Sequence, residues 1–167
     1  MTSSPDDERA AAYRAAASRL PAGVTVVTVQ HGHLDLAMTA TAVSSVSLYP
    51  PLVLFCVHED ARFRDALDRR DVWAVSVLSD EDAPVADWLA APGRPAVGQL
   101  DRVPHRRGEA TGAALLDGAA AWFECRTHAI HHAGDHDVVI GEVLGCGQGD
   151  PALGALIHHR GRVRPVR

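Results

Sequence analysis

The chain has 167 residues, of which 47% are hydrophobic and 5% aromatic, and its formal net charge is −5. This length predicts a single domain, residues 1–167, and the composition is typical of a compact globular protein with a core of Ala, Val and Leu. All the formal positive charge is arginine. The negative balance, with no basic stripe visible in the sequence, argues against nucleic acid or an anionic membrane as a partner.

The cysteines and the N-terminal segment bear on localisation. Cys56, Cys125 and Cys146 are odd in number and widely spaced, which favours a reducing compartment over a disulfide framework or a structural zinc site. The first residues, MTSSPDDERAAA, are acidic and lack the apolar core of a signal peptide. No stretch approaches the roughly 18 apolar residues that a membrane span requires. We therefore expect a soluble, cytoplasmic protein.

The first third of the chain predicts a helix followed by strands. Ser4-Pro5 has the chemistry of a helix start, and Pro21 and Gly23 end the helix. Residues 24–29, VTVVTV, are β-branched throughout and predict a strand, with residues 34–38 as its hairpin partner. The unbroken apolar run 52–57, LVLFCV, predicts a strand that is buried on both faces.

The middle of the chain predicts two short helices, a strand between them and a long loop. Asp60 is expected to cap the first helix, and the segment 79–82 repeats a capping pattern before the second. Residues 72–78 predict the strand, and residues 92–111, rich in Pro, Gly and Arg, predict the loop. The apolar helix faces are Phe63, Ala66 and Leu67 in the first helix and Val85, Trp88 and Leu89 in the second.

The last third predicts further strands. Residues 119–130 alternate as in a half-exposed antiparallel strand, and residues 137–144 form the next strand. The exposed side of the first strand is expected to carry Glu124, Arg126 and His128. Because no amphipathic helix follows Gly145, Gly147 and Gly149, we interpret these glycines as a turn and not as a dinucleotide-binding loop.

The final strands, residues 153–159 and 162–166, are expected to meet at Gly161. The whole chain then has about seven hairpin-connected strands and two or three short peripheral helices, without the strand–helix alternation of a parallel sheet. This pattern predicts a mainly β fold, a closed or nearly closed antiparallel barrel.

The candidate working surface is residues 38–51, MTATAVSSVSLYPP. The segment lacks bulky core residues, and its short hydroxyls and backbone amides suit a flat ligand with polar edges lying along the chain. An ordinary Ser/Thr-rich edge strand explains the same composition equally well.

Sequence motifs for several enzyme classes are absent: there is no P-loop, no His-Glu-x-x-His and no Gly-x-Ser-x-Gly. His128, His131 and His132 straddle a predicted turn with His136 and show no metal-ligand spacing, so most of them are expected to be exposed loop residues and no metal is expected. His136 differs, because Gly134-Asp135-His136 leads into a strand that can aim the imidazole into a pocket.

Six segments, in this order, resemble a known family: LPAGVTVVTV, AMTATAVSSVSLYPPLVLFCV, VWAVSVL, WFECRTHAI, GDHDVVIGEVL and HHRGRVR. The sequence is similar over nearly its whole length to the flavin reductase-like proteins. These are small split antiparallel β-barrel enzymes, of the FMN-binding, Greek-key type, that use NADH or NADPH to reduce FMN or FAD. The resemblance implies a homodimer with the flavin in a groove near the subunit interface.

The resemblance also implies roles for particular residues. Those near residue 40 would run past the flavin ring, those at the end of the strand 52–57 would line the ring or the ribityl chain, and His136 would lie near the nicotinamide and the reactive face of the flavin. The implied cofactor-binding residues are Thr39, Ala40, Thr41, Ser44, Ser45, Val46, Cys56, Val57, His58, Ala61, Arg62 and Trp88.

The segment 58–62 departs from the family pattern, which carries Ser and then Thr in contact with the flavin phosphate. Glu59 and Asp60 would repel a phosphate dianion, whereas Arg62 and a helix N-terminus would attract it, so loose flavin binding is expected. Thr41 and Ser76 also stand where the family has Asn. The loop arginines, Arg94, Arg102, Arg106 and Arg107, are candidates for the 2′-phosphate of NADPH and equally for a solvated face.

The leading hypothesis is an NAD(P)H:flavin oxidoreductase that reduces free FMN or FAD and supplies the reduced flavin to a partner monooxygenase. Hydride transfer requires the protein to bind a stacked pair of rings, orient them and exclude water, which short hydroxyls and backbone amides can do. The alternatives are a non-catalytic flavin-binding or carrier protein and a barrel that serves a non-redox biosynthetic step.

Overall fold

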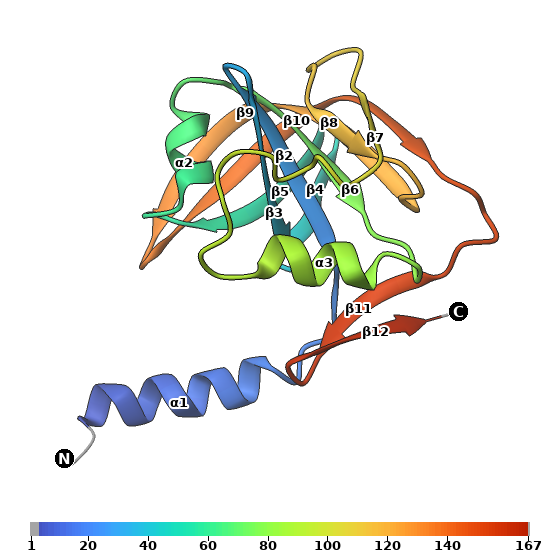
Figure 1. The fold of residues 1–167 in the computed structure, drawn as a ribbon. Helices are drawn as coiled ribbons and strands as arrows, with labels where there is room; N and C mark the ends of the chain where they lie inside the picture. Colours follow the sequence, from blue (N-terminus) through green and yellow to red (C-terminus); the bar gives the residue numbers. More distant parts are fainter. Residues whose placement is uncertain (1–3, 167) are drawn as a thin grey trace.

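A seven-stranded antiparallel sheet forms the body of the protein (Figure 1). The computed structural model describes residues 4–166, so the predicted domain limits at residues 1 and 167 lie outside the described part. The strand order is β3-β2-β6-β9-β10-β5-β4, and the two edge strands follow one another in the chain. The strands are β2 (Thr25–His31), β3 (Leu34–Ala40), β4 (Val43–Leu48), β5 (Pro51–His58), β6 (Val72–Val77), β9 (Ala121–Ala133) and β10 (His136–Gln148). The predicted mainly β, antiparallel fold is confirmed.

Two small sheets and three helices surround this body. A three-stranded sheet has the order β1-β11-β12, and a two-stranded sheet pairs β7 with β8. Their strands are β1 (Ala22–Gly23), β11 (Ala155–His159), β12 (Arg162–Val166), β7 (His105–Arg107) and β8 (Ala114–Leu116). The helices are α1 (Pro5–Ala17), α2 (Arg62–Leu67) and α3 (Ala83–Ala90). The predicted loop 92–111 is therefore interrupted by β7.

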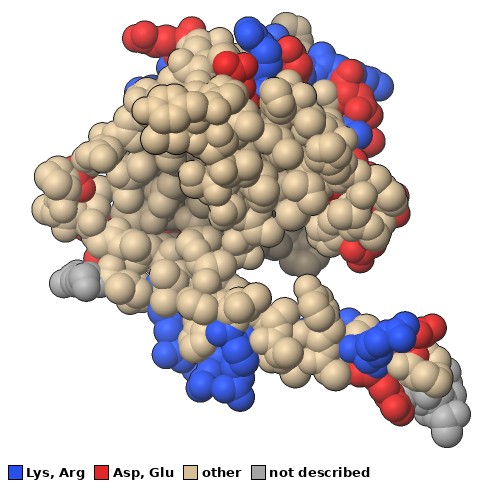
Figure 2. Space-filling view, turned by 180° about the vertical axis from the view of Figure 1, so that it is seen from behind, with Lys and Arg blue, Asp and Glu red and all other residues tan. Residues whose placement is uncertain are grey.

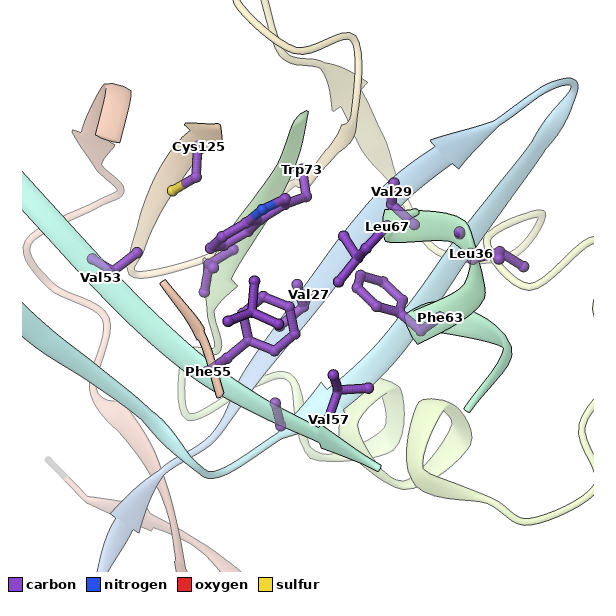
Figure 3. Packing of buried hydrophobic residues seen from close by; sticks show 14 residues of the cluster. Val27, Val29, Leu36, Val53, Phe55, Val57, Phe63, Leu67, Trp73 and Cys125 are labelled. Atoms are coloured by element: carbon purple, nitrogen blue, oxygen red, sulfur yellow. The ribbon is translucent and has the colours of Figure 1, made fainter. Parts of the chain in front are cut away.

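Aromatic side chains fill the main core, although they are few in the chain (Figure 3). The Phe55 ring meets Trp73 edge to face, with 4.8 Å between ring centroids, and meets Phe63 of α2 at 6.0 Å. Val27 and Val29 of β2 are fully buried against the same cluster. Such contacts add to the burial of apolar area and fix how α2 packs against the sheet.

Strand β5 is not buried on both faces as its apolar run predicts. Val53, Phe55 and Val57 point into the core, and the residues between them are only half-buried. The physical reason is that β5 lies next to the edge strand β4, so one of its faces packs on the core and the other stays partly exposed.

Strands β9 and β10 correct two further expectations. Glu124 is buried, with 3% of its surface exposed, because the backbone N–H groups of Ala110 and Thr111 donate to its carboxylate. Gly145 and Gly147 lie inside β10 and not in a turn. A Cβ on Gly147 would come within 2.6 Å of the Trp122 ring on β9, so close ring packing accounts for this glycine.

The helix starts agree only in part with the sequence. Ser4 caps α1 reciprocally with Asp7, as its sequence predicts. The N-cap of α2 is Ala61 and not Asp60, with no side-chain cap bond. The Asp82 carboxylate accepts from the Ser79 N–H at 2.8 Å, but this bond closes the turn before α3 rather than capping the helix.

Helix α1 projects from the body and buries none of its side chains (Figure 1). Over residues 4–166, no helix is both long enough and apolar enough to cross a membrane.

Candidate functional site

The end of β5 meets the β9–β10 hairpin and brings two histidines together. His136, the first residue of β10, is the cross-strand partner of His58. Their ring centroids lie 5.2 Å apart, with an interplanar angle of 68°. Antiparallel register therefore places His136 beside the last residue of β5, the strand that leads into α2.

Hydrogen bonds orient both imidazoles. His136 Nδ1 donates to the Asp135 carboxylate at 2.7 Å, which leaves Nε2 as the ring nitrogen for a ligand. The Asp60 backbone N–H donates to His58 Nδ1 at 3.1 Å. The bond from His136 holds the pKa of the Asp135 carboxyl below its ordinary value.

An ionic group of Arg64, Asp137 and His132 lies next to the histidine pair. The Arg64 guanidinium of α2 donates to Asp137, and this bond is the main cause that lowers the pKa of the Asp137 carboxyl. His132 Nδ1 also lies 3.2 Å from Asp137. The Arg64–Asp137 pair connects α2 to β10 at the residue that follows His136.

A cavity of about 270 Å³ opens beside the same end of β5. Ala61 and Arg62 at the start of α2 line one side, and Arg94 and Gln99 of the long loop line another. Arg62 donates to the Arg94 carbonyl at 3.1 Å, so the two arginines lie close together. Asp60 also lines the cavity and is the carboxylate that opposes them.

Arg94 is incompletely satisfied. Its guanidinium donates to the Ala37 carbonyl at 2.6 Å and to the Ala91 carbonyl at 3.3 Å, but its buried Nε has no partner. Burial, and then the neighbouring Arg62, lower the pKa of Arg94. Two guanidiniums and an unpaired buried N–H are the donors that a phosphate group would satisfy, so the residues present fit a phosphorylated ligand.

Gln99 holds the loop against the edge of the sheet. The Ala37 N–H of β3 donates to Gln99 Oε1 at 2.9 Å, and Gln99 Nε2 donates to the Pro95 carbonyl at 2.8 Å. Side chains of the loop thus take the place of a neighbouring strand along β3. Trp88 Nε1 donates to the Gln99 carbonyl at 2.9 Å, and Trp88 lines a separate cavity of about 510 Å³ on the far side of the loop.

The predicted hydroxyl residues are spread over two strands and differ in accessibility. Ser44, Ser45 and Val46 are exposed on β4. Thr39, in contrast, donates its hydroxyl to the Ala86 carbonyl of α3 at 2.8 Å. The side chains of Ala40 and Val57 are buried, at 6% and 2% exposure, so only their backbone can meet a ligand.

The structure thus pairs His136 with His58, and the chain runs from His58 directly to Ala61 and Arg62 at the start of α2, whereas Trp88 lines another cavity. Cys56 is half-buried on the outer face of β5, and Thr41 lies in the link between β3 and β4. Sequence patterns did not connect Arg94 with Arg62, because the two are 32 positions apart and nothing in the loop marks its fold. The sequence signal that could have indicated Arg94 is its position in the loop, between Pro92-Gly93 and Pro95.

The neighbouring histidines are exposed in β9 and not in a loop, and they do not form a metal centre. Within residues 4–166, no group of three or more His, Cys, Asp or Glu side chains is arranged to hold a metal ion. Two of the other loop arginines have partners on the protein. Arg106 lies over the Trp122 ring, 5.2 Å from its centroid, and Arg107 bonds Asp35.

Antiparallel sheets with three short helices around them are the architecture of a split barrel. A family model described as the flavin reductase like domain matches residues 17–167, and the chain belongs to this family.

Characterised relatives are similar over most of their length. An NADH-dependent FAD reductase of Streptomyces globisporus is 42% identical over 145 residues, covering 86% of this chain and 79% of that protein. The reductase component of a 4-hydroxyphenylacetate 3-monooxygenase from Thermus thermophilus is 35% identical over 144 residues, covering 85% and 89%.

The fold is shared with solved structures. The NADH:FAD oxidoreductase SgcE6 of Streptomyces globisporus C-1027 has a TM-score of 0.89 at 38% identity, covering 100% of this chain and 98% of that chain. A further structure of SgcE6, in complex with NAD and FAD fragments, has a TM-score of 0.89 at 37% identity and covers 100% and 97%. The split-barrel class expected from the sequence is confirmed.

Proposed function

We propose that this protein is an NADH-dependent flavin reductase that reduces FAD or FMN and supplies the reduced flavin to a partner oxygenase. The observation that carries the proposal is that the His58–His136 pair stands at the end of β5 from which the chain runs directly into Ala61 and Arg62 of the arginine-lined cavity. Membership of the flavin reductase-like family supports the same assignment.

The two parts of the site suit the two parts of a flavin nucleotide. In hydride transfer, two electrons and one proton leave the dihydronicotinamide, which is oxidised, and reduce the flavin ring. Arg62 and Arg94 would hold the flavin phosphate, and the β4 serines with the backbone near residue 40 would lie along the ring. His136, fixed by Asp135, would position the nicotinamide through its free nitrogen.

The mode of flavin binding follows from the charges of the cavity. Asp60 shares the cavity with the two arginines and weakens the net attraction for a phosphate dianion. Flavin is accordingly a substrate that binds, is reduced and leaves, as a reductase that feeds a separate oxygenase requires.

We also propose a homodimer and a cytoplasmic location. Edge strand β4 and the turn after it expose Val46, Leu48 and Tyr49, at 46%, 70% and 89%, next to the serines of the site. Helix α1 has no buried side chain on its own protomer. Both surfaces are of the kind that a second copy would cover, which would close the flavin groove.

A direct assay tests the function. Purified protein is mixed with NADH or NADPH and with FMN or FAD, and oxidation is followed at the nicotinamide absorbance band, with protein-free mixtures as controls. We expect turnover with NADH and free flavin. Flavin binding without turnover would instead identify a carrier, and the absence of flavin binding would point to a non-redox role for the barrel.

A further inference from the structure

The β11–β12 hairpin carries a group of exposed arginines that the site does not use. Arg160, Arg162 and Arg164, here called the hairpin arginine patch, are all exposed. Within residues 4–166, none of the three forms an ion pair, whereas Arg64 and Arg107 do. Figure 2 shows Lys and Arg residues gathered below the body, where the hairpin lies in Figure 1. The sequence, read for a basic stripe, did not reveal this local group of arginines.

Strand register creates the patch. Arg162 pairs with His159 and Arg164 with Ile157, so the two arginines share one face of the hairpin with these partners. Val166, 45% exposed, continues the same face. The surface is thus a mixture of guanidinium groups, the His159 imidazole and aliphatic side chains.

Backbone strain singles out Arg160. It has φ 55°, and it is the only residue other than glycine with a positive φ in the described part of the chain. Arg160 and Gly161 form the two-residue turn of the hairpin, a position that Asn, Asp or Gly normally occupies. The Arg160 backbone N–H donates to the Ser18 carbonyl at 2.7 Å, and this bond helps to hold the turn in its conformation.

We propose that the hairpin arginine patch docks an acidic protein surface. If the proposed function holds, that surface belongs to the oxygenase component that receives the reduced flavin. A mixed arginine and aliphatic face is typical of protein interfaces. An isolated phosphate ligand would need a concave site, which an exposed hairpin face does not present. Basic clusters that bind membranes typically have about four to eight basic residues, whereas the patch is defined by three arginines.

The net negative charge of the chain directs an acidic partner to the hairpin arginine patch. With a net charge of −5, the protein as a whole repels acidic partners, so we expect attraction to act locally at the hairpin. Docking through arginines would then fix the orientation of the partner and accelerate encounter more than it would raise affinity.

The probe for the test is fluorescently labelled poly-L-glutamate, with binding followed by fluorescence anisotropy across a salt series. The test variant is Arg162→Gln with Arg164→Gln, and the control with the same charge change is Arg69→Gln with Arg126→Gln, both exposed. We expect saturable, salt-sensitive binding that falls about tenfold in the test variant and stays near wild type in the control. NADH oxidation with free flavin should be the same in all three proteins, so failure of docking and failure of the proposed function are distinguishable.

Three outcomes would overturn the proposal. Equal losses in both double variants would mean that net charge alone matters. Tighter binding to phosphatidylglycerol vesicles than to poly-L-glutamate would assign the patch to a membrane. A change of sedimentation coefficient in Arg162→Gln/Arg164→Gln would make it a contact between copies of this chain.

A second variant tests the strained turn. Arg160→Gly should raise the thermal midpoint, because glycine adopts a positive φ without strain, while poly-L-glutamate binding weakens. A higher midpoint with unchanged binding would remove Arg160 from the docking surface.

Discussion

The two ends of the candidate site are built differently. The histidine end, His58 and His136, rests on strand register, and its imidazoles are oriented by short local bonds such as the one to Asp135. The arginine end depends on a loop and the first turn of a short helix, and it contains a buried N–H that the protein does not satisfy. The imidazoles of the histidine end have partners on the protein, whereas the arginine end leaves a buried donor without one.

This difference suggests that the histidine end orients the reacting rings and that the arginine end binds the flavin phosphate. Groups held by a sheet keep their geometry without a ligand, which suits the alignment of two rings for hydride transfer. Groups held by a loop adapt to a ligand that enters and leaves, at the expense of affinity. Variants at the two ends should therefore affect different kinetic constants.

The largest effect is expected at the arginine end. Arg62→Gln with Arg94→Gln should weaken FMN binding about 100-fold, since hydrogen bonds to charged groups contribute about 1.5–3 kcal/mol each. Riboflavin, which lacks the phosphate, should bind equally well to the variant and the wild type. Fluorescence titration measures both, with Arg69→Gln as the control. Parallel losses for the two flavins would contradict a phosphate site.

At the histidine end, His136→Ala should lower kcat about tenfold through misalignment, with FMN binding nearly unchanged. The control is His128→Ala, an exposed histidine on β9. Steady-state NADH oxidation and flavin titration provide the measurements. Full NADH turnover and NADH affinity in His136→Ala would remove this residue from the site.

A smaller effect concerns the ionic support beneath the histidines. The folded chain lowers the pKa of the Asp137 carboxyl, chiefly through Arg64, so its contribution to stability is full above the ordinary pKa of about 3.9 and is lost as pH falls through the folded value. Asp137→Asn should be less stable at neutral pH and lose less stability on acidification. Urea unfolding at several pH values tests this, with the exposed Asp87→Asn as control. An unchanged pH slope would refute the role of Asp137.

The smallest effect separates structural from accessible hydroxyls. Thr39→Val should lower the free energy of unfolding by about 1 kcal/mol, because it leaves the Ala86 carbonyl without its donor. Ser44→Ala, on the exposed strand β4, should change it by less than about 0.5 kcal/mol. Chemical denaturation measures both, and equal losses would show that the Thr39 bond does not matter.

Local sequence patterns predicted most strands and the family. The β-branched run of β2, the capping residues of α1 and the Gly134-Asp135-His136 entry to β10 each act over a few neighbours, so the sequence was enough to place them. The candidate residues at the end of β5 followed from the same motifs and the family resemblance.

Tertiary structure decided the features that join distant segments. Only packing made Glu124 a buried acceptor for the 110–111 backbone, gave β5 one buried face, and placed Arg94 beside Arg62. The hairpin arginine patch likewise depends on the register of β11 with β12. Alternation and composition indicate the secondary structure and burial that a residue favours. Its partner across the sheet or loop depends on the tertiary fold of the whole chain.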